Sequence, residues 1–139
     1  MIALALGFAW QRWGVLLLTA ASVAIADVAA TGLKAAIDLQ RPSSHYASPT
    51  TLVPAPHDHS FPSGHAATSF AAATVLTAFA PRFAPVWFLL ALAIGFARVY
   101  VGVHYPFDVV GGAVLGVVTA LLLLAAVRRR SRGEMQSAR

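Results

Sequence analysis

The chain contains no cysteine, and few of its residues carry a charge. Its 139 residues include no Cys, and only 11% are Asp, Glu, Lys or Arg. The lack of cysteine excludes disulfides, thiolate metal sites and a cysteine nucleophile. With 58% hydrophobic residues and a mean hydropathy of +0.72, the composition lies outside the range of soluble domains and indicates a membrane protein.

Acidic residues are scarcer than basic ones, so the formal net charge is +5. A basic protein can bind nucleic acid, but here a group of arginines directly follows a long apolar run. The group comprises Arg128, Arg129, Arg130 and Arg132. Such a cluster is typical of the cytoplasmic end of a membrane helix. We therefore expect membrane lipids as partners, and no nucleic acid.

Four apolar runs are long enough to cross a bilayer as helices: residues 13–33, 62–80, 86–104 and 107–127. They predict an all-α fold, a polytopic membrane helix bundle of about four full transmembrane helices in a single domain, residues 1–139. The apolar start, residues 1–10, is too short to span and lacks the basic region of a signal peptide. We expect a separate short segment there, either the end of a helix that begins before this chain or an interfacial segment.

Two stretches lack a regular apolar pattern. Residues 43–61, rich in Pro, Ser and His, predict a loop over the site. Within this loop His57-Asp58-His59 has the residue types of a metal site, but we favour a solvated polar loop and predict no metal. Residues 128–139 form a basic tail that we expect to be mobile.

The first polar cluster follows the first predicted span. Asp27, Lys34 and Arg41 are spaced by seven residues, so a continuous helix would place all three on one face. Pro42 disfavours a helical conformation at Arg41 and marks the end of the element. We expect Asp27 to be a partner of Lys34 or a buried polar contact, and not a catalytic group.

The second cluster is Pro62-Ser63-Gly64-His65, which opens an apolar run. Ser63 is a candidate N-cap, and Gly64 lets backbone amides approach a ligand closely. The free amides of a helix N-terminus favour anions. This cluster therefore predicts an anion-binding helix start.

The third cluster is the segment of Arg98, His104 and Asp108, which lies between apolar runs. On one helix, His104 and Asp108 would share a face, and a carboxylate beside an imidazole fixes its tautomer and raises its basicity. Because Pro106 lies between them, we expect the pair to meet across a turn instead. Charged groups on apolar segments are costly to desolvate, so they indicate a functional site.

Alternating spans bring the three clusters to one membrane face and the arginines at 12, 82 and 128–132 to the other. The positive-inside rule makes the arginine face cytoplasmic. We therefore expect a multi-pass protein of the plasma membrane (the inner membrane of a bacterium), with an extracytoplasmic active site and a cytoplasmic C-terminus.

The converging side chains fit phosphoryl transfer. Lys34, Arg41 and Arg98 are suited to bind the charged oxygens of a phosphoryl group, and Ser63 and Gly64 add donors at a helix start. These five are the predicted phosphate-binding residues.

Two histidines supply the reactive groups. We assign His104 as nucleophile because it has a carboxylate neighbour, Asp108, which orients it. His65 is the general acid that protonates the leaving oxygen, and later the base that activates water. The predicted catalytic residues are therefore His104, His65 and Asp108.

At these residues the sequence resembles the type-2 phosphatidic acid phosphatase superfamily. The shared pattern has three parts: Lys34 with six residues before Arg41-Pro42, Pro62-Ser63-Gly64-His65, and Arg98 with five residues before His104 and three more before Asp108. The family comprises lipid phosphate phosphatases and shares its site architecture with vanadium haloperoxidases and glucose-6-phosphatase. The resemblance implies a metal-independent, cofactor-free phosphatase that hydrolyses a phosphate monoester or diphosphate on a lipid through a phosphohistidine.

The chain departs from the family pattern in two ways. Ala97 stands where the family usually has Ser, and members in membranes typically have six spans, more than this chain provides. A catalytically impaired fragment that binds anionic lipid head groups, or serves as a structural partner, is therefore the alternative function. A vanadate-dependent haloperoxidase is less favoured because the chain is a membrane bundle. Stripes of small residues also permit a homodimer.

Overall fold

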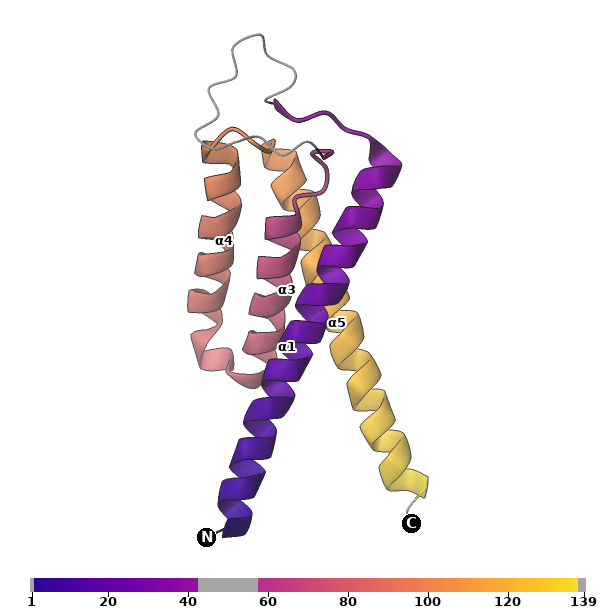
Figure 1. The fold of residues 1–139 in the computed structure, drawn as a ribbon. Helices are drawn as coiled ribbons and strands as arrows, with labels where there is room; N and C mark the ends of the chain where they lie inside the picture. The colour runs from indigo at the N-terminus through magenta and orange to yellow at the C-terminus, as the bar shows by residue number, and fades with distance from the viewer. Residues whose placement is uncertain (1, 43–57, 138–139) are drawn as a thin grey trace.

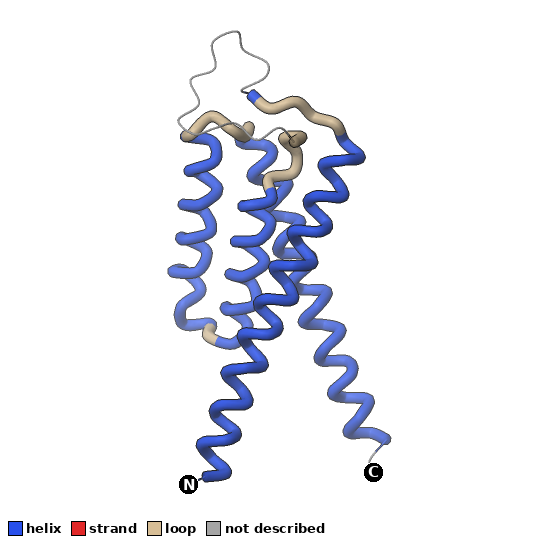
Figure 2. Tube along the Cα trace, viewed as in Figure 1, coloured by secondary structure: helices blue, strands red, loops and turns tan. Residues whose placement is uncertain are grey.

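The computed structural model describes residues 2–42 and 58–137, with the backbone alone for residues 2–12 and 135. The described part consists of helices and the turns and irregular segments between them, as Figure 2 shows. The elements are α1 (Ile2–Ile37), α3 (Gly64–Phe79), the short 3-10 helix η1 (Pro81–Phe83), α4 (Ala84–Tyr100) and α5 (Pro106–Ser137). The predicted all-α membrane helix bundle is confirmed.

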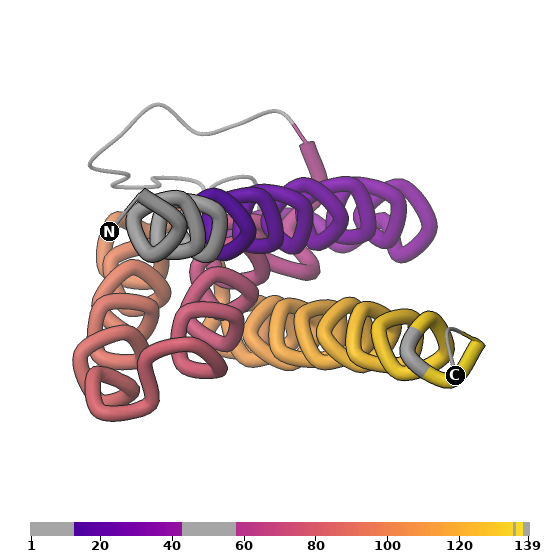
Figure 3. Tube along the Cα trace, turned by 90° about the horizontal axis from the view of Figure 1, so that it is seen from below, coloured from indigo at the N-terminus to yellow at the C-terminus, as the bar shows by residue number. Residues whose placement is uncertain are grey.

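Helix α3 lies at the centre of the bundle and contacts α1, α4 and α5 (Figure 3). Its buried face is rich in small residues: Ala66, Ala67, Ala71 and Ala73. Helix α5 meets this face with two glycines. A Cβ on Gly112 or Gly116 would overlap the main-chain oxygen of Ser63 or Ala67, respectively. The small residues of both helices thus allow close backbone approach.

Within the described residues, three helical segments are long and apolar enough to cross a membrane: Trp13–Ile37, Pro81–Tyr100 and Pro106–Glu134. Helix α3 has 16 residues, about 24 Å of rise, which is short for a span. Where we expected four full spans, the described residues therefore form three spans around a shorter central helix. The Ser63 cap and Pro81 limit this helix at its two ends.

Two predicted boundaries are wrong, since regular helix continues past both. Residues 2–10 do not form a separate segment, because α1 runs without a break from Ile2 to Ile37. No proline or glycine separates residues 8 and 13, so nothing in the local sequence ends the helix there. The basic tail is helical as far as Ser137, and Arg130 Nε lies 3.2 Å from Glu134 Oε1 one turn away.

The polar end of α1 differs from the prediction. The helix ends at Ile37, and Asp38 adopts a left-handed conformation with φ of 49°. Asp27 and Lys34 therefore share a helix face, but Arg41 lies beyond the helix. The Ser60 amide donates to the Leu39 carbonyl at 2.7 Å, which joins this segment to the one before α3. Residues 43–57 of the predicted loop lie outside the described residues.

The two ends of the bundle carry different groups (Figure 1). Both chain termini and the η1 turn, which contains Arg82, lie at one end. The connection from α4 to α5, the segment after α1 and the start of α3 meet at the other. This second end is where the three predicted polar clusters come together.

Candidate active site

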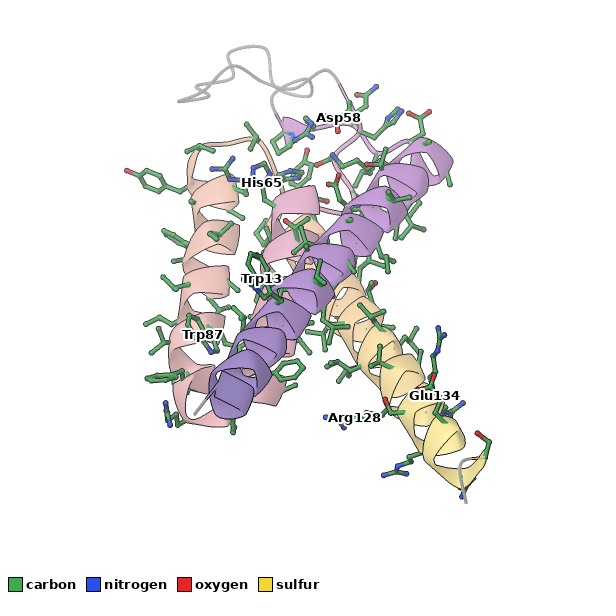
Figure 4. All side chains as sticks on the ribbon, turned by 60° about the horizontal axis from the view of Figure 1, so that its bottom comes forward. Trp13, Asp58, His65, Trp87, Arg128 and Glu134 are labelled. Atoms are coloured by element: carbon green, nitrogen blue, oxygen red, sulfur yellow. The ribbon has the colours of Figure 1, made fainter. Side chains whose placement is uncertain are left out.

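A cavity of about 340 Å³ opens among these segments. Its wall combines cations, carboxylates and two histidines from α1, α3, α4 and the segments between the helices. The lining residues are Asp27, Ala30, Thr31, Lys34, Arg41, Asp58, Gly64, His65, Thr68, Arg98, Val103 and His104. Figure 4 shows Asp58 and His65 at this end of the bundle, and Arg128 and Glu134 at the other.

His104 and Asp108 meet across the turn between α4 and α5, as the intervening proline predicted. Pro106 is the first residue of α5, and Asp108 lies in its first turn. One carboxylate oxygen of Asp108, Oδ2, accepts from the Tyr105 amide at 2.8 Å, which is half of a capping box. The same oxygen lies 3.3 Å from His104 Nδ1. The cap of α5 therefore also holds the imidazole.

The surroundings of His104 define its tautomer. A carboxylate facing Nδ1 favours the proton on that nitrogen, which leaves a lone pair on Nε2. His104 Nε2 lies 3.2 Å from Arg41 NH1, and His104 lines the cavity. Both His104 and Asp108 are buried. The arrangement leaves an oriented imidazole nitrogen with a lone pair at the cavity wall.

Ser60 is a contact of the pair that the sequence did not reveal. Its hydroxyl donates to Asp108 Oδ2, and the residue is fully buried. A serine in a segment rich in Ser, Pro and His carries no periodic signal, so only the fold brings it to Asp108. Ser60 adds a third donor to the oxygen that faces His104.

Arg41 is buried, and its hydrogen bonds join its own segment to the segments of Asp58 and Val103. Its Nε donates to the Asp58 carbonyl at 2.8 Å, and NH1 donates to the Val103 carbonyl at 2.8 Å. NH2 donates to Asp58 Oδ1 at 2.7 Å. A planar guanidinium has donors in several fixed directions, which suits it to this role.

Asp58 bridges two of the predicted phosphate-binding cations. Its Oδ2 accepts from Lys34 Nζ, and its Oδ1 accepts from Arg41. Partial burial raises the pKa of Asp58, but the hydrogen bonds and charges of Lys34 and Arg41 outweigh it and lower the pKa to about 2. The sequence predicted a solvated polar loop at Asp58 and not its ion pairs with Lys34 and Arg41.

Of the motif considered for a metal, only Asp58 and His59 lie within the described residues. His57 lies outside the described residues, and His59 Nδ1 pairs with Asp38 Oδ1 at 2.9 Å. Among residues 2–42 and 58–137, no group of three His, Asp or Glu residues is placed to hold a metal.

The remaining phosphate-binding candidates lie at helix ends. Arg98 is in the last turn of α4, and its buried Nε has no hydrogen-bond partner within the described part of the chain. Gly64 and His65 begin α3 and line the cavity. Ser63 is the predicted N-cap, and its Oγ accepts from the Ala66 amide at 3.5 Å. Its hydroxyl is buried and is not part of the cavity wall.

Asp27 lines the cavity, whereas the carboxylate that contacts Lys34 belongs to Asp58. Thr31 lines the cavity between Asp27 and Lys34, four residues after the first and three before the second. Helical spacing from these two residues would have found Thr31. Thr68 of α3 also lines the cavity, and helical spacing from Gly64, four residues earlier, would have found it.

Comparison with known proteins decides the family. A model of the PAP2 superfamily matches residues 13–132, most of the chain. The chain belongs to the PAP2 superfamily. This finding confirms the resemblance drawn from the three motifs, and it places all three within the matched region.

Two curated relatives show sequence similarity over about half of the chain. A bacitracin transport permease protein BcrC of Bacillus licheniformis is 42% identical over 66 residues, 48% of this chain and 32% of that protein. An undecaprenyl-diphosphatase of Sulfolobus acidocaldarius is 41% identical over 76 residues, 52% of this chain and 36% of that protein. The matches thus span about a third of these relatives.

Two solved structures of the superfamily share the fold. Aquifex aeolicus LpxE has a TM-score of 0.72 and 28% identity, and the match covers 89% of this chain and 75% of that one. A transmembrane PAP2 type phosphatidylglycerolphosphate phosphatase from Bacillus subtilis has a TM-score of 0.63 and 27% identity over 81% of this chain and 59% of that one. Both support a membrane bundle.

Proposed function

We propose that the protein is a membrane lipid phosphate phosphatase that acts on a phosphate monoester or diphosphate through a phosphohistidine. The observation that carries this proposal is the placement of His104. Its Nδ1 faces Asp108, and it lines the same cavity as His65, Lys34 and Arg98. A nucleophile, a second histidine and phosphate-binding cations therefore face one space.

In the first step His104 Nε2 attacks phosphorus, and the bond from phosphorus to the leaving oxygen breaks. His65 gives its proton to that oxygen, so the lipid leaves as an alcohol from a monoester, or as a lipid phosphate from a diphosphate, without an unfavourable charge on the oxygen. Asp108 stabilises the imidazolium that forms on His104 and keeps its proton on Nδ1. In the second step His65 takes a proton from water, the hydroxide attacks phosphorus, and His104 is released with inorganic phosphate.

Lys34, Arg41 and Arg98 bind the phosphoryl oxygens, on which negative charge accumulates in the transition state. Gly64 contributes its amide at the N-terminus of α3. Ser63 contributes indirectly, because its side chain caps the helix that presents Gly64 and His65.

The names of the relatives support a lipid substrate. One is an undecaprenyl-diphosphatase, and another is a phosphatidylglycerolphosphate phosphatase. Both names describe the removal of phosphate from a lipid, one from a diphosphate and the other from a monoester. A cavity at the end of a bundle of apolar helices suits such a substrate, since the lipid tail stays in the membrane while the head group enters.

The charge asymmetry supports an orientation in the membrane. Arg82, Arg128 and Glu134 lie at the end opposite the cavity, and that end carries the whole arginine cluster. We place this end in the cytoplasm and the cavity on the extracytoplasmic side. For a homodimer, the contact would use a face other than the glycines of α5, because Gly112 and Gly116 already pack against α3.

The test is phosphate release by the purified chain in detergent, with phosphatidic acid and a polyprenyl diphosphate as separate substrates and EDTA present. We expect release from at least one lipid, and its loss to background in His104→Ala, because the phosphohistidine cannot form. His59→Ala is the matched control, since His59 lies at the same end but does not line the cavity. Full activity of His104→Ala would contradict the mechanism, and binding without release would support the alternative of an inert lipid-binding fragment.

A further inference from the structure

A carboxylate occupies the part of the cavity where two cations converge. The two oxygens of Asp58 accept from different partners, Oδ1 from Arg41 NH2 at 2.7 Å and Oδ2 from Lys34 Nζ. Two oxygens of one phosphoryl group would bridge the same donors in the same way. Asp58 therefore holds two of the three cations that we propose for substrate phosphate.

The three side chains differ in burial. The Asp58 side chain is 51% exposed, whereas those of Lys34 and Arg41 are 13% and 3% exposed. Asp58 thus lies on the open side of the cations. Its main-chain carbonyl is held by Arg41 Nε at 2.8 Å, so the carboxylate can leave by side-chain rotation while the backbone stays.

The third cation is in a different state. Arg98 lines the same cavity, and within the described residues its buried Nε has no hydrogen-bond partner. A phosphate that reaches Arg98 and the start of α3 would find Lys34 and Arg41 already paired. Binding to all three cations then requires that Asp58 give up its two ion pairs.

We propose that Asp58 is an internal competitor for the phosphate site, whose carboxylate leaves Lys34 and Arg41 when a phosphate binds and returns when it departs. The identity of the ligand rests on the function proposed above. Every anion that fills the site must break the same two ion pairs. Asp58 therefore lowers the affinity of the site for every such anion by the same factor. Asp58 is then a residue that sets affinity.

This competition has two consequences for an enzyme embedded in phospholipid. Singly charged phosphodiester head groups of the surrounding membrane gain less from the cations than a doubly charged phosphate does, and the added cost keeps them from filling the site. Product phosphate is also released more readily, because the returning carboxylate replaces it. The low pKa of Asp58, about 2, keeps the carboxylate charged near neutral pH.

The experiment measures binding and not turnover. The full chain in a maltoside detergent, which contains no phosphorus, is titrated with inorganic phosphate and separately with dimethyl phosphate, followed by phosphorus NMR. In Asp58→Asn we expect the Kd of both ligands to fall by the same factor, about tenfold, between the values typical of exposed and of buried ion pairs. Asp38→Asn is the control, because Asp38 is an exposed carboxylate at the same end that does not line the cavity.

Two results would overturn the proposal. A larger decrease for phosphate than for dimethyl phosphate would mean that the carboxylate stays in place and repels ligands by charge. An unchanged or higher Kd would mean that Asp58 is peripheral or positions the cations. Asp58→Ser, which also removes both ion pairs, must give the same result as Asp58→Asn. Because binding is measured without hydrolysis, an inactive wild-type chain would contradict the proposed function and leave this test intact.

Discussion

Two ion pairs in this chain have the same spacing but opposite surroundings. His104 and Asp108 are four residues apart with 3.3 Å between Nδ1 and Oδ2, and Arg130 and Glu134 are four apart with 3.2 Å between Nε and Oε1. The side chains of the first pair are 4% and 0% exposed, and those of the second are 85% and 69% exposed. Spacing and distance therefore do not distinguish the two pairs, whereas burial beside the cavity does.

The two ion pairs differ physically in their access to solvent. Water and salt screen the exposed pair, so it contributes little to stability. A buried carboxylate depends on donors from the protein, and Asp108 Oδ2 accepts from the Ser60 hydroxyl and the Tyr105 amide and faces the His104 ring. Its Oδ1 has no hydrogen-bond partner within the described residues. The buried pair is thus oriented by its surroundings, while the exposed pair is free to exchange with water.

Among the substitutions that test this comparison, Asp108→Asn is expected to lower kcat the most. The amide keeps the size of the side chain but lacks the charge that stabilises the imidazolium and fixes the His104 tautomer. We expect kcat for phosphate release to fall by about 10³-fold or more, as for the orienting acid of other triads. The rate of phosphate release at saturating lipid substrate measures it.

Glu134→Gln is the matched change in the exposed pair. It removes the same charge at the same spacing, and we expect kcat within about twofold of the wild type. Similar losses from the two substitutions would show that burial does not separate the pairs.

A second prediction compares the packing at two positions along α5. A Cβ on Gly116 would overlap the Ala67 carbonyl of α3, whereas a Cβ on Gly133 meets no atom within 4 Å. Gly116→Ala is therefore expected to destabilise the bundle by about 1 to 3 kcal/mol, the usual cost of overpacking. The midpoint of thermal unfolding in detergent measures the change, and a midpoint for Gly116→Ala at or above that of Gly133→Ala would contradict the close helix contact.

Of the two substitutions expected to lower kcat, the one that removes the Ser60 hydroxyl has the smaller effect. Ser60→Ala removes one hydrogen bond to a charged carboxylate, and we expect kcat to fall about tenfold. Ser60→Thr and Ser60→Val separate the hydroxyl from side-chain volume, since the two have nearly the same shape. Thr should retain clearly more activity than Val, and equal activities would show that Ser60 only fills space.

Most of the candidate site was predictable because its residues fall in regular elements or at their ends. Lys34, His65, Arg98 and His104 were each predicted, and the structure brings all four to one cavity. Asp58 and Ser60 were not predicted as site residues. They lie in an irregular segment, where side-chain direction depends on how the chain folds back and not on a repeating pattern.

The positions at which the helices end were also not predictable from the sequence. The continuity of α1 through residue 11, its end at Ile37 and the helical tail were not predicted, because hydropathy reports where a helix can cross lipid and not where its hydrogen bonds stop. Composition and apolar runs determined the membrane bundle, and the three motifs determined the family and which residues we propose to react. Only the tertiary structure decided which charges are paired. The contacts of Asp58 with Lys34 and Arg41 and of Ser60 with Asp108 join residues 17 to 48 positions apart, and such contacts depend on how whole segments pack.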